Sequence, residues 1–401
     1  MTTMNVLYLV HRLPYPPNKG DKLRSFHELS YLRRRHQVWC GCFVDDPADL
    51  LHVDAVRAMC ADAAAIRLFK AVSTPRGLWN LARGGTFTEG YYQHLQMVRT
   101  LHRWNSQVAF DAVLVFSSGM APYAQCVNAP RKVLDFCDLD SRKWTAYARR
   151  ASGARARLYD IEGRRLATRE LQWLNEFDAA AVITDAEAAD LGVSALRQRV
   201  FTISNGVTIP ELPESQWIPP TPVAGFVGCM DYPPNIDAVV WFVREIWPLI
   251  RRRVPDASFE IVGRHPTRAV RALADAPGVH VVGEVDDVFS FVRRFRVSVS
   301  PIRIARGLQN KVLEAMAAAR PVVLTSAAAT GLSAKDGVHY LIADAASAFA
   351  EQVVSLLADP DRCFRLGAAA RRFVAANHCW EREMSRLESL LFAPAPSSTS
   401  G

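Results

Sequence analysis

The sequence predicts an α/β protein built from two consecutive, Rossmann-like, doubly wound domains that face each other across a cleft. Three observations lead to this prediction. Short apolar segments alternate with helix-length segments, a proline-rich stretch interrupts the alternation once, and the same alternation then starts again. Strands separated by helices form parallel sheets that helices cover on both faces. The 401 residues suffice for two hydrophobic cores.

The first half of the chain begins with a short apolar run over residues 5–10, which predicts a buried strand. A loop rich in proline and glycine follows, and the pattern then predicts a helix over residues 21–35. The further strands predicted in this half are residues 37–43, 111–116, 132–136, 179–184 and 199–204.

Five of the fifteen residues in the stretch 209–223 are proline. Proline lacks a backbone N–H, so this stretch cannot form a helix or a central strand and is predicted to be a linker. The linker separates an N-terminal domain over residues 1–208 from a C-terminal domain over residues 224–392. Residues 393–401 have the composition of a disordered tail.

The second half repeats the alternation. The predicted strands are residues 224–229, 258–263, 279–282, 297–301 and 321–325, and the predicted helices are residues 235–253 and 309–319. A ligand of such a protein is expected at the carboxyl edges of the strands, in the cleft.

Composition excludes several classes of protein. No run of about 20 apolar residues is present, so a membrane-spanning helix is not expected. The eight cysteines lack the spacing of a zinc site, and we interpret them as reduced thiols in a cytoplasmic protein. No G-x-G-x-x-G follows the first strand of either half, which argues against a dehydrogenase.

Positive charge is concentrated between residues 142 and 169, where nine basic and two acidic residues are interleaved with three aromatic ones. This composition suits an anionic membrane surface or a phosphate-bearing substrate. It also suits an ordinary solvated helix face or, less well, nucleic acid, which we do not expect as a partner. The protein is predicted to be cytoplasmic, and the first of these alternatives would make it peripheral on the inner face of the cytoplasmic membrane.

The segment around residue 309 is the most informative for chemistry. A buried strand ends near Pro301, a glycine-bearing loop follows, and a helix begins near Gln309. The amino terminus of a helix attracts anions, Gly307 allows close backbone approach, and Lys311 can add a positive charge, so a diphosphate would fit there. Glu314 could accept both hydroxyls of a ribose. Alternatively, these side chains have only structural roles.

The segment 308–323, which reads LQNKVLEAMAAARPVV, closely resembles the donor-site segment of family 4 glycosyltransferases. Residues 225–235 resemble the branch of that family associated with PEP-CTERM/exosortase exopolysaccharide loci. Further similarity covers residues 11–24, 135–144 and 204–207. The two central motifs are specific together, whereas Asn-Gly-Val at residues 205–207 is weak by itself.

The resemblance implies a GT-B fold whose C-terminal domain binds a nucleotide diphosphate sugar as donor and whose N-terminal domain lies on the acceptor side. It implies no cofactor and no required metal. It also implies transfer with retention of configuration, by front-face attack of the acceptor. Family members commonly carry two glutamates eight positions apart, of which Glu314 matches the second and Arg306 replaces the first. The usual arginine and lysine near residues 230–235 are missing as well. We therefore assign the diphosphate to Lys311, Arg303 and Arg306.

The complete predicted donor site combines residues of the loop and the helix with one residue of the first domain. Its members are Gly20, Arg303, Arg306, Gly307, Gln309, Asn310, Lys311 and Glu314. Gly20 is expected to let the backbone approach the donor phosphates. Asp21 and Arg24, on the helix after it, are candidate acceptor contacts, although Asp21 could simply cap that helix.

Acidic residues follow a strand near residue 136, so their side chains are expected at its carboxyl end. Asp138 together with Ser141 could orient an acceptor hydroxyl, or Asp138 could cap the next helix. Asp138 and His11 are the candidate catalytic bases if the reaction inverts the configuration. A lone histidine is more often structural.

The sequence therefore predicts a glycosyltransferase that moves a sugar from a nucleotide diphosphate donor to an exopolysaccharide or envelope glycan precursor. The acceptor would be a saccharide or a lipid-linked saccharide. Two other readings remain: a nucleotide-sugar epimerase or phosphorylase of the same architecture, and a non-catalytic scaffold in a polysaccharide assembly complex.

Overall fold

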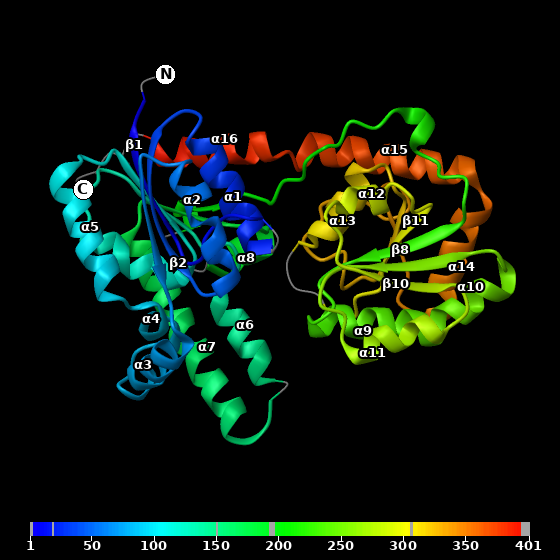
Figure 1. Cartoon of the computed structure of the whole chain (residues 1–401), viewed down its shortest axis with the longest axis horizontal. Coiled ribbons are helices and arrows are strands. Elements are labelled where there is room, and N and C mark those ends of the chain that lie inside the picture. Colours follow the sequence, from blue (N-terminus) through cyan, green and yellow to red (C-terminus); the bar gives the residue numbers. More distant parts are fainter. Residues whose placement is uncertain (1–2, 18–19, 150, 192–196, 305–307, 394–401) are drawn as a thin grey trace. The chain divides into compact units, whose positions relative to one another are not determined.

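The computed structural model describes residues 3–17, 20–149, 151–191, 197–304 and 308–393. Contacts within the chain divide it into two compact units (Figure 1). The first unit comprises Met1–Ser204 and Glu381–Gly401, and the second comprises Asn205–Trp380. Each unit contains one parallel sheet with helices on its faces, as the sequence predicts.

The sheet of the first unit has the strand order β3-β2-β1-β4-β5-β6-β7, and all its pairings are parallel. The strands are β1 (Asn5–Val10), β2 (Gln37–Val44), β3 (Asp62–Arg67), β4 (Ala112–Phe116), β5 (Lys132–Asp135), β6 (Ala179–Val182) and β7 (Val200–Thr202). The order reverses between β1 and β4, which is the topological switch point of a doubly wound sheet.

Helices flank this sheet on both faces. They are α1 (Gly20–Leu32), α2 (Val53–Arg57), α3 (Lys70–Ala82), α4 (Phe87–Tyr92), α5 (Leu95–Gln107), α6 (Asp140–Ala148), α7 (Gly153–Glu176), α8 (Asp185–Leu191) and α16 (Trp380–Leu391). Strand β1 is completely buried from Val6 to Val10, because a central parallel strand is covered on both faces. Among the described residues, no helix is long and apolar enough to cross a membrane.

The sheet of the second unit has the order β10-β9-β8-β11-β12-β13 and is also parallel throughout. Its strands are β8 (Val223–Val227), β9 (Ser258–Val262), β10 (Val279–Gly283), β11 (Val297–Ser300), β12 (Val322–Leu324) and β13 (Leu341–Ile342). Its helices are α9 (Pro233–Trp241), α10 (Trp247–Arg253), α11 (Arg268–Arg271), α12 (Val288–Val292), α13 (Asn310–Ala317), α14 (Ala346–Ala358) and α15 (Pro360–Asn377).

The division into units differs from the predicted domain boundaries at the C-terminal end. Helix α16, which the sequence assigns to the second domain, belongs to the first unit (Figure 1). Its Glu388 accepts one hydrogen bond of 2.9 Å from the Tyr31 hydroxyl and lies 2.8 Å from Nε2 of His36. These partners lie more than 350 positions away along the chain, so no local pattern reveals the pairing. Of the predicted tail, only Ala393 lies within the described residues.

The predicted linker also differs from the structure. The stretch contains no regular helix or strand up to residue 222, as its prolines predict. A short 3₁₀ turn over Glu214–Gln216 interrupts an otherwise irregular backbone. However, the stretch is not independent of the second unit. Leu212 and Trp217 are buried there, and Trp217 stacks on Phe364 of α15. Burial of these side chains fixes the stretch to the second unit.

Two further elements depart from the sequence pattern. The predicted helix over residues 235–253 is divided into α9 and α10 by a π-helical segment, Phe242–Ile246. Pro248 explains the interruption, because it has no N–H to donate and its ring clashes with the carbonyl four residues earlier. Strand β3 was not predicted, since the three alanines in Asp62–Arg67 do not indicate a strand.

Candidate functional site

The switch point of the second sheet lies between β8 and β11. Helix α9 follows β8 and helix α13 follows β11, so the loops before these two helices diverge at the carboxyl edge of the sheet. Ligands of doubly wound sheets bind at this point. The predicted donor residues around α13 therefore lie where the topology favours a binding site.

Lys311, in the first turn of α13, reaches back over the end of β8. Its Nζ donates a hydrogen bond of 2.6 Å to Oδ1 of Asn235 and lies 4.7 Å from the centre of the Phe226 ring. Gly228 leaves the space for this contact, because a Cβ at that position would lie 3.2 Å from the Lys311 Nζ. Asn235 lies within residues 230–235, where the expected arginine and lysine are missing. The Lys311 amine brings a positive charge to this segment.

The pKa values of the two ionisable groups on this helix are shifted toward each other. Desolvation lowers the pKa of Lys311 to about 7, against the opposing effect of the Glu314 charge. Desolvation raises the pKa of Glu314 to about 7, against the attraction of Lys311. Both side chains are half-buried and keep some access to solvent. A bound anion would favour the protonated form of Lys311, so this pair can respond to a diphosphate.

The loops after β8 and β9 pass close to each other. Gly263 has a φ of 147°, and a Cβ there would lie 1.7 Å from the Gly228 carbonyl oxygen, so only glycine fits. This approach brings Arg264 next to the β8 loop, where its Nε lies 3.2 Å from the Cys229 sulfur. Sequence reasoning missed Arg264, and the glycine at the end of a predicted strand was the available signal.

The other predicted donor residues occupy different surroundings. Gln309 is the N-cap residue of α13, and the Asn310 side chain accepts a hydrogen bond of 3.1 Å from Asn205. The Arg303 guanidinium forms two hydrogen bonds with Asp237 of α9, at 2.6 and 3.0 Å. The Arg303 guanidinium would have to break these hydrogen bonds to Asp237 before it could contact a diphosphate. Arg306 and Gly307 lie outside the described residues.

In the first unit, His11 follows β1 at the switch point. Its ring stacks on Phe116 with centroids 5.7 Å apart, and its Nε2 lies 3.3 Å from the Asp21 carboxylate. Asp21 also pairs with Arg12 at 2.6 Å. Burial alone would raise the pKa of Asp21, but the hydrogen bonds and charges of His11 and Arg12 hold it well below its usual range. Helix α1 begins one residue earlier, at Gly20, so Asp21 lies in the first turn of the helix rather than at its cap.

Asp138 lies just beyond the carboxyl end of β5 and is exposed to solvent. Desolvation, followed by the negative charges of Glu187 and Asp140, raises its pKa to about 7. Leu139 is the N-cap residue of α6, so the structure does not assign Asp138 the capping role. Asp138 and His11 remain predictions as catalytic bases.

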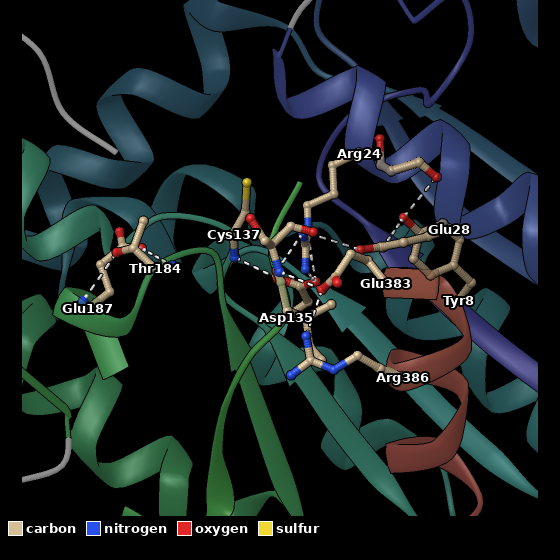
Figure 2. A network of polar contacts seen from close by, with 12 residues as sticks. Tyr8, Arg24, Glu28, Asp135, Cys137, Thr184, Glu187, Glu383 and Arg386 are labelled. Carbon is tan, nitrogen blue, oxygen red and sulfur yellow. Dashed lines mark hydrogen bonds and ion pairs between the residues drawn. The ribbon is translucent and has the colours of Figure 1, made fainter. Parts of the chain in front are cut away.

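The structure contradicts the prediction that Arg24 contacts the acceptor. Arg24 is completely buried, and Figure 2 shows it within a network of polar contacts. Its guanidinium donates to Asp135 at 2.9 Å and to the Ile203 carbonyl at 2.9 Å, and it lies 3.3 Å from Glu28. No part of the side chain is left for a substrate.

Ser141 also has a structural role instead of the predicted one. Its side chain is 6% exposed, and its hydroxyl and backbone N–H both donate to Glu170 of α7, at 2.5 and 3.0 Å. Desolvation raises the pKa of Glu170 to about 7, against these hydrogen bonds. An acceptor could reach Ser141 only by displacing Glu170. Gly20, in contrast, is exposed at the start of α1 and stays a predicted donor contact.

A cavity of about 580 Å³ lies in the second unit but away from the predicted donor residues. It is lined by Val223, Ser258 and His280, which lie at the amino-terminal ends of β8, β9 and β10. Ligands of parallel sheets bind at the opposite, carboxyl edge. We therefore place the candidate site around Lys311 and not in this cavity.

The second unit is similar in sequence to a known protein family. Residues 221–359, all within the second unit, match the model of the family described as Glycosyl transferases group 1. A stretch of 162 residues is 32% identical to the GDP-mannose-dependent alpha-(1-6)-phosphatidylinositol monomannoside mannosyltransferase of Mycolicibacterium smegmatis. The same enzyme of Mycobacterium tuberculosis is also 32% identical. These matches cover 36% of this chain and 42% and 41% of the two relatives, so less than half of each relative is matched.

Solved structures resemble the whole chain. TarM has a TM-score of 0.68 at 13% identity, with 98% of this chain and 99% of TarM covered. HepE of Anabaena in complex with UDP and glucose has a TM-score of 0.67 at 13% identity, covering 98% and 100%. Sucrose-phosphate synthase of Thermosynechococcus elongatus has a TM-score of 0.69 at 17% identity, covering 96% and 98%. The chain therefore has the GT-B fold of these proteins, and its second unit is similar in sequence to the group 1 glycosyl transferases.

Proposed function

We propose that this protein is a glycosyltransferase that moves a sugar from a nucleotide diphosphate donor to a saccharide or lipid-linked saccharide acceptor. The observation that carries the proposal is the position of Lys311. Its amine lies at the amino end of α13, at the switch point of the second sheet, with Glu314 one turn further along. A helix amino terminus and a lysine together suit a diphosphate. Glu314 would accept hydrogen bonds from the two ribose hydroxyls.

The similar proteins support this class of donor without fixing the base. The mycobacterial relatives are named as GDP-mannose-dependent, whereas the HepE structure contains UDP. We propose that the sugar is transferred to an exopolysaccharide or envelope glycan precursor. The support for this acceptor is the resemblance of residues 225–235 to the branch associated with PEP-CTERM/exosortase exopolysaccharide loci. The reaction would take place at the inner face of the cytoplasmic membrane, on a precursor held there.

We propose that configuration is retained through front-face attack. In this reaction the acceptor oxygen forms a bond to the anomeric carbon on the face from which the diphosphate leaves. The leaving phosphate oxygen takes the acceptor proton, so a separate base is not needed. The protein positions both substrates, and Lys311 and the α13 N–H groups stabilise the charge that develops on the diphosphate. Since these groups supply the positive charge, a metal would not be required.

The test is incubation of the protein with labelled UDP- and GDP-sugars and a mixture of membrane-derived acceptors, with and without EDTA. Transfer, or slow hydrolysis of one donor, supports the proposal, and Lys311→Ala should abolish it. Analysis of the anomeric configuration in the product tests retention. Isomerisation of the sugar without transfer would instead show an epimerase. Failure of every nucleotide to bind would overturn the proposal.

A further inference from the structure

Helix α3 exposes its apolar side chains to solvent. The exposed fractions are 54% for Phe69 at its N-cap, 61% for Val72, 43% for Leu78 and 65% for Trp79. Positions 72 and 79 lie seven residues apart and therefore share one side of the helix. Leu78 lies about a quarter-turn round from Trp79, and Phe69 lies at the start of the helix. We call Phe69, Val72, Leu78 and Trp79 the α3 surface.

The opposite face of α3 is buried although its residues are mostly smaller. Ser73, Gly77 and Leu81 face the protein. A Cβ on Gly77 would lie 2.7 Å from the Phe87 ring of α4, so the two helices pack closely there. A helix in water normally buries its large apolar residues and exposes its small and polar ones. The reversal in α3 indicates that something other than water covers the α3 surface.

All charged side chains of the stretch 63–88, which contains the α3 surface, are positive. Arg67 lies 4.7 Å from the centre of the Phe69 ring, Arg83 lies 5.8 Å from the Trp79 ring, and Lys70 is exposed beside them. None of these three cations forms an ion pair with a described residue. No acidic residue occurs in the sequence between positions 62 and 89. The occupant of this surface must therefore be apolar and negatively charged.

The helix is held rigidly to the rest of the first unit. Arg165 of α7 donates hydrogen bonds to the carbonyl oxygens of Leu81 and Gly85, and Asn80 donates to Thr86 at 2.7 Å. Glu162 of α7 accepts a hydrogen bond of 2.9 Å from the Thr88 backbone N–H. Figure 1 shows α3, α4 and α7 next to one another. A surface fixed in this way loses little conformational entropy when it binds.

We propose that the α3 surface lies on an anionic lipid bilayer, with Trp79 and Phe69 at the level of the headgroups and the flanking cations on the lipid phosphates. A bilayer fits better than a protein partner, because apolar and aromatic side chains flanked by cations match the interface of an anionic membrane. The proposal deepens the proposed function by naming the surface that meets the membrane. It differs from the sequence analysis, in which a membrane surface is one of the alternatives for residues 142–169.

The aromatic residues of that stretch contact one another, and the most exposed of them, Tyr147, is 39% exposed, compared with 65% for Trp79. The rings of Trp144 and Tyr159 lie 5.2 Å apart, and Tyr147 lies 6.0 Å from each of them. In this proposal, helix α7 holds α3 in place and adds positive charge beside it. The α3 surface provides the apolar contact with the bilayer.

The experiment is co-sedimentation of the full chain with vesicles that contain phosphatidylglycerol or phosphatidylcholine alone. We expect binding to the anionic vesicles that weakens with salt. Trp79 is the exposed one of the nine tryptophans, all of which lie in the described part of the chain. Its fluorescence should shift to the blue and be quenched by brominated lipids. Trp79→Phe should remove this signal while leaving most of the binding.

The double variant Val72→Ser/Leu78→Ser should lower the partition coefficient by roughly tenfold or more, because less apolar area enters the bilayer. Val338→Ser is the matched control, since Val338 is 50% exposed in the second unit. Circular dichroism verifies that the variants fold. Equal binding by the double variant, or no binding to anionic vesicles, would overturn the proposal. So would self-association without lipid that the double variant abolishes. None of these measurements uses turnover, so failure here is distinct from failure of the proposed function.

Discussion

Charged residues lie near the carboxyl edges of both sheets, but their surroundings differ. In the first unit, Arg24 is completely buried, and Asp135 and Glu28 satisfy it (Figure 2). Tyr8 completes this network with a hydrogen bond of 2.8 Å to Glu28. In the second unit, Lys311 has the neutral Asn235 as its hydrogen-bond partner and forms no ion pair with a described residue.

The number of partners that the protein gives a buried charge distinguishes a structural charge from one that can bind a ligand. A buried charge with a full set of partners fixes the fold, and removing one partner leaves an uncompensated charge. A charge that the protein compensates only in part has a shifted pKa and favours a ligand of opposite charge. Desolvation alone would lower the pKa of Arg24, but the charges of Asp135 and Glu28 hold it above its usual value. Desolvation does lower the pKa of Lys311, to about 7, and the site around it stays available to an anion.

The largest effect is expected when the buried network of the first unit is broken. Arg24→Met should lower the free energy of unfolding by about 3–5 kcal/mol, because Asp135 and Glu28 lose their cation. Chemical denaturation measures this change. Arg24→Met/Asp135→Leu should recover part of the loss. Lys311→Met is the control in the second unit and should leave stability unchanged or raise it, since a desolvated amine is removed. A smaller loss for Arg24→Met than for Lys311→Met would contradict the comparison.

The second prediction concerns nucleotide affinity. Lys311→Ala should weaken binding of the nucleotide diphosphate by about 1.5–3 kcal/mol, as expected for a hydrogen bond to a charged group. Isothermal titration calorimetry with the nucleotide that stabilises the protein measures this. Arg303→Ala is the matched control and should change affinity little, because Asp237 already occupies its guanidinium. The reverse order of effects would show that Arg303 turns toward the ligand.

The third prediction is a maximum of nucleotide affinity near pH 7. Above the lowered pKa of Lys311, about 7, the amine loses its proton and attracts the diphosphate less. Below the raised pKa of Glu314, also about 7, the carboxylate is protonated and accepts the ribose hydroxyls less well. Well above the maximum, affinity should fall by at most roughly tenfold per pH unit. Lys311→Arg should remove the alkaline decline, and a decline that persists would assign it to another group.

The smallest effect is expected from Asn205, which holds the first residue of α13 through its hydrogen bond to Asn310. Asn205→Ala should weaken nucleotide binding by about 0.5–1.5 kcal/mol, because the amino end of the helix is less well positioned. Asn175→Ala is the control, since Asn175 is an exposed residue of the first unit. A drop in stability with no change in nucleotide affinity would limit Asn205 to a structural role.

Local patterns predicted much of the fold. Strand β1 has the predicted bounds, because an apolar run that a loop of proline and glycine follows specifies a buried strand without distant information. Helix α13 and its lysine were also predictable, since a strand, a loop and a helix in succession place the helix amino terminus at the sheet edge. The sequence by itself therefore determined the fold class and the part of the site that a single β-loop-α unit builds.

Only the tertiary structure decided which charges are satisfied. Arg24 and Asp135 lie 111 positions apart, and nothing near Arg24 in the sequence reveals that its charge is buried. Asn205 and Asn310 meet across 105 positions, and α16 returns to the first unit from the far end of the chain. The physical reason is that desolvation and charge pairing depend on everything that surrounds a group in space, whereas helix and strand patterns depend on neighbours along the chain.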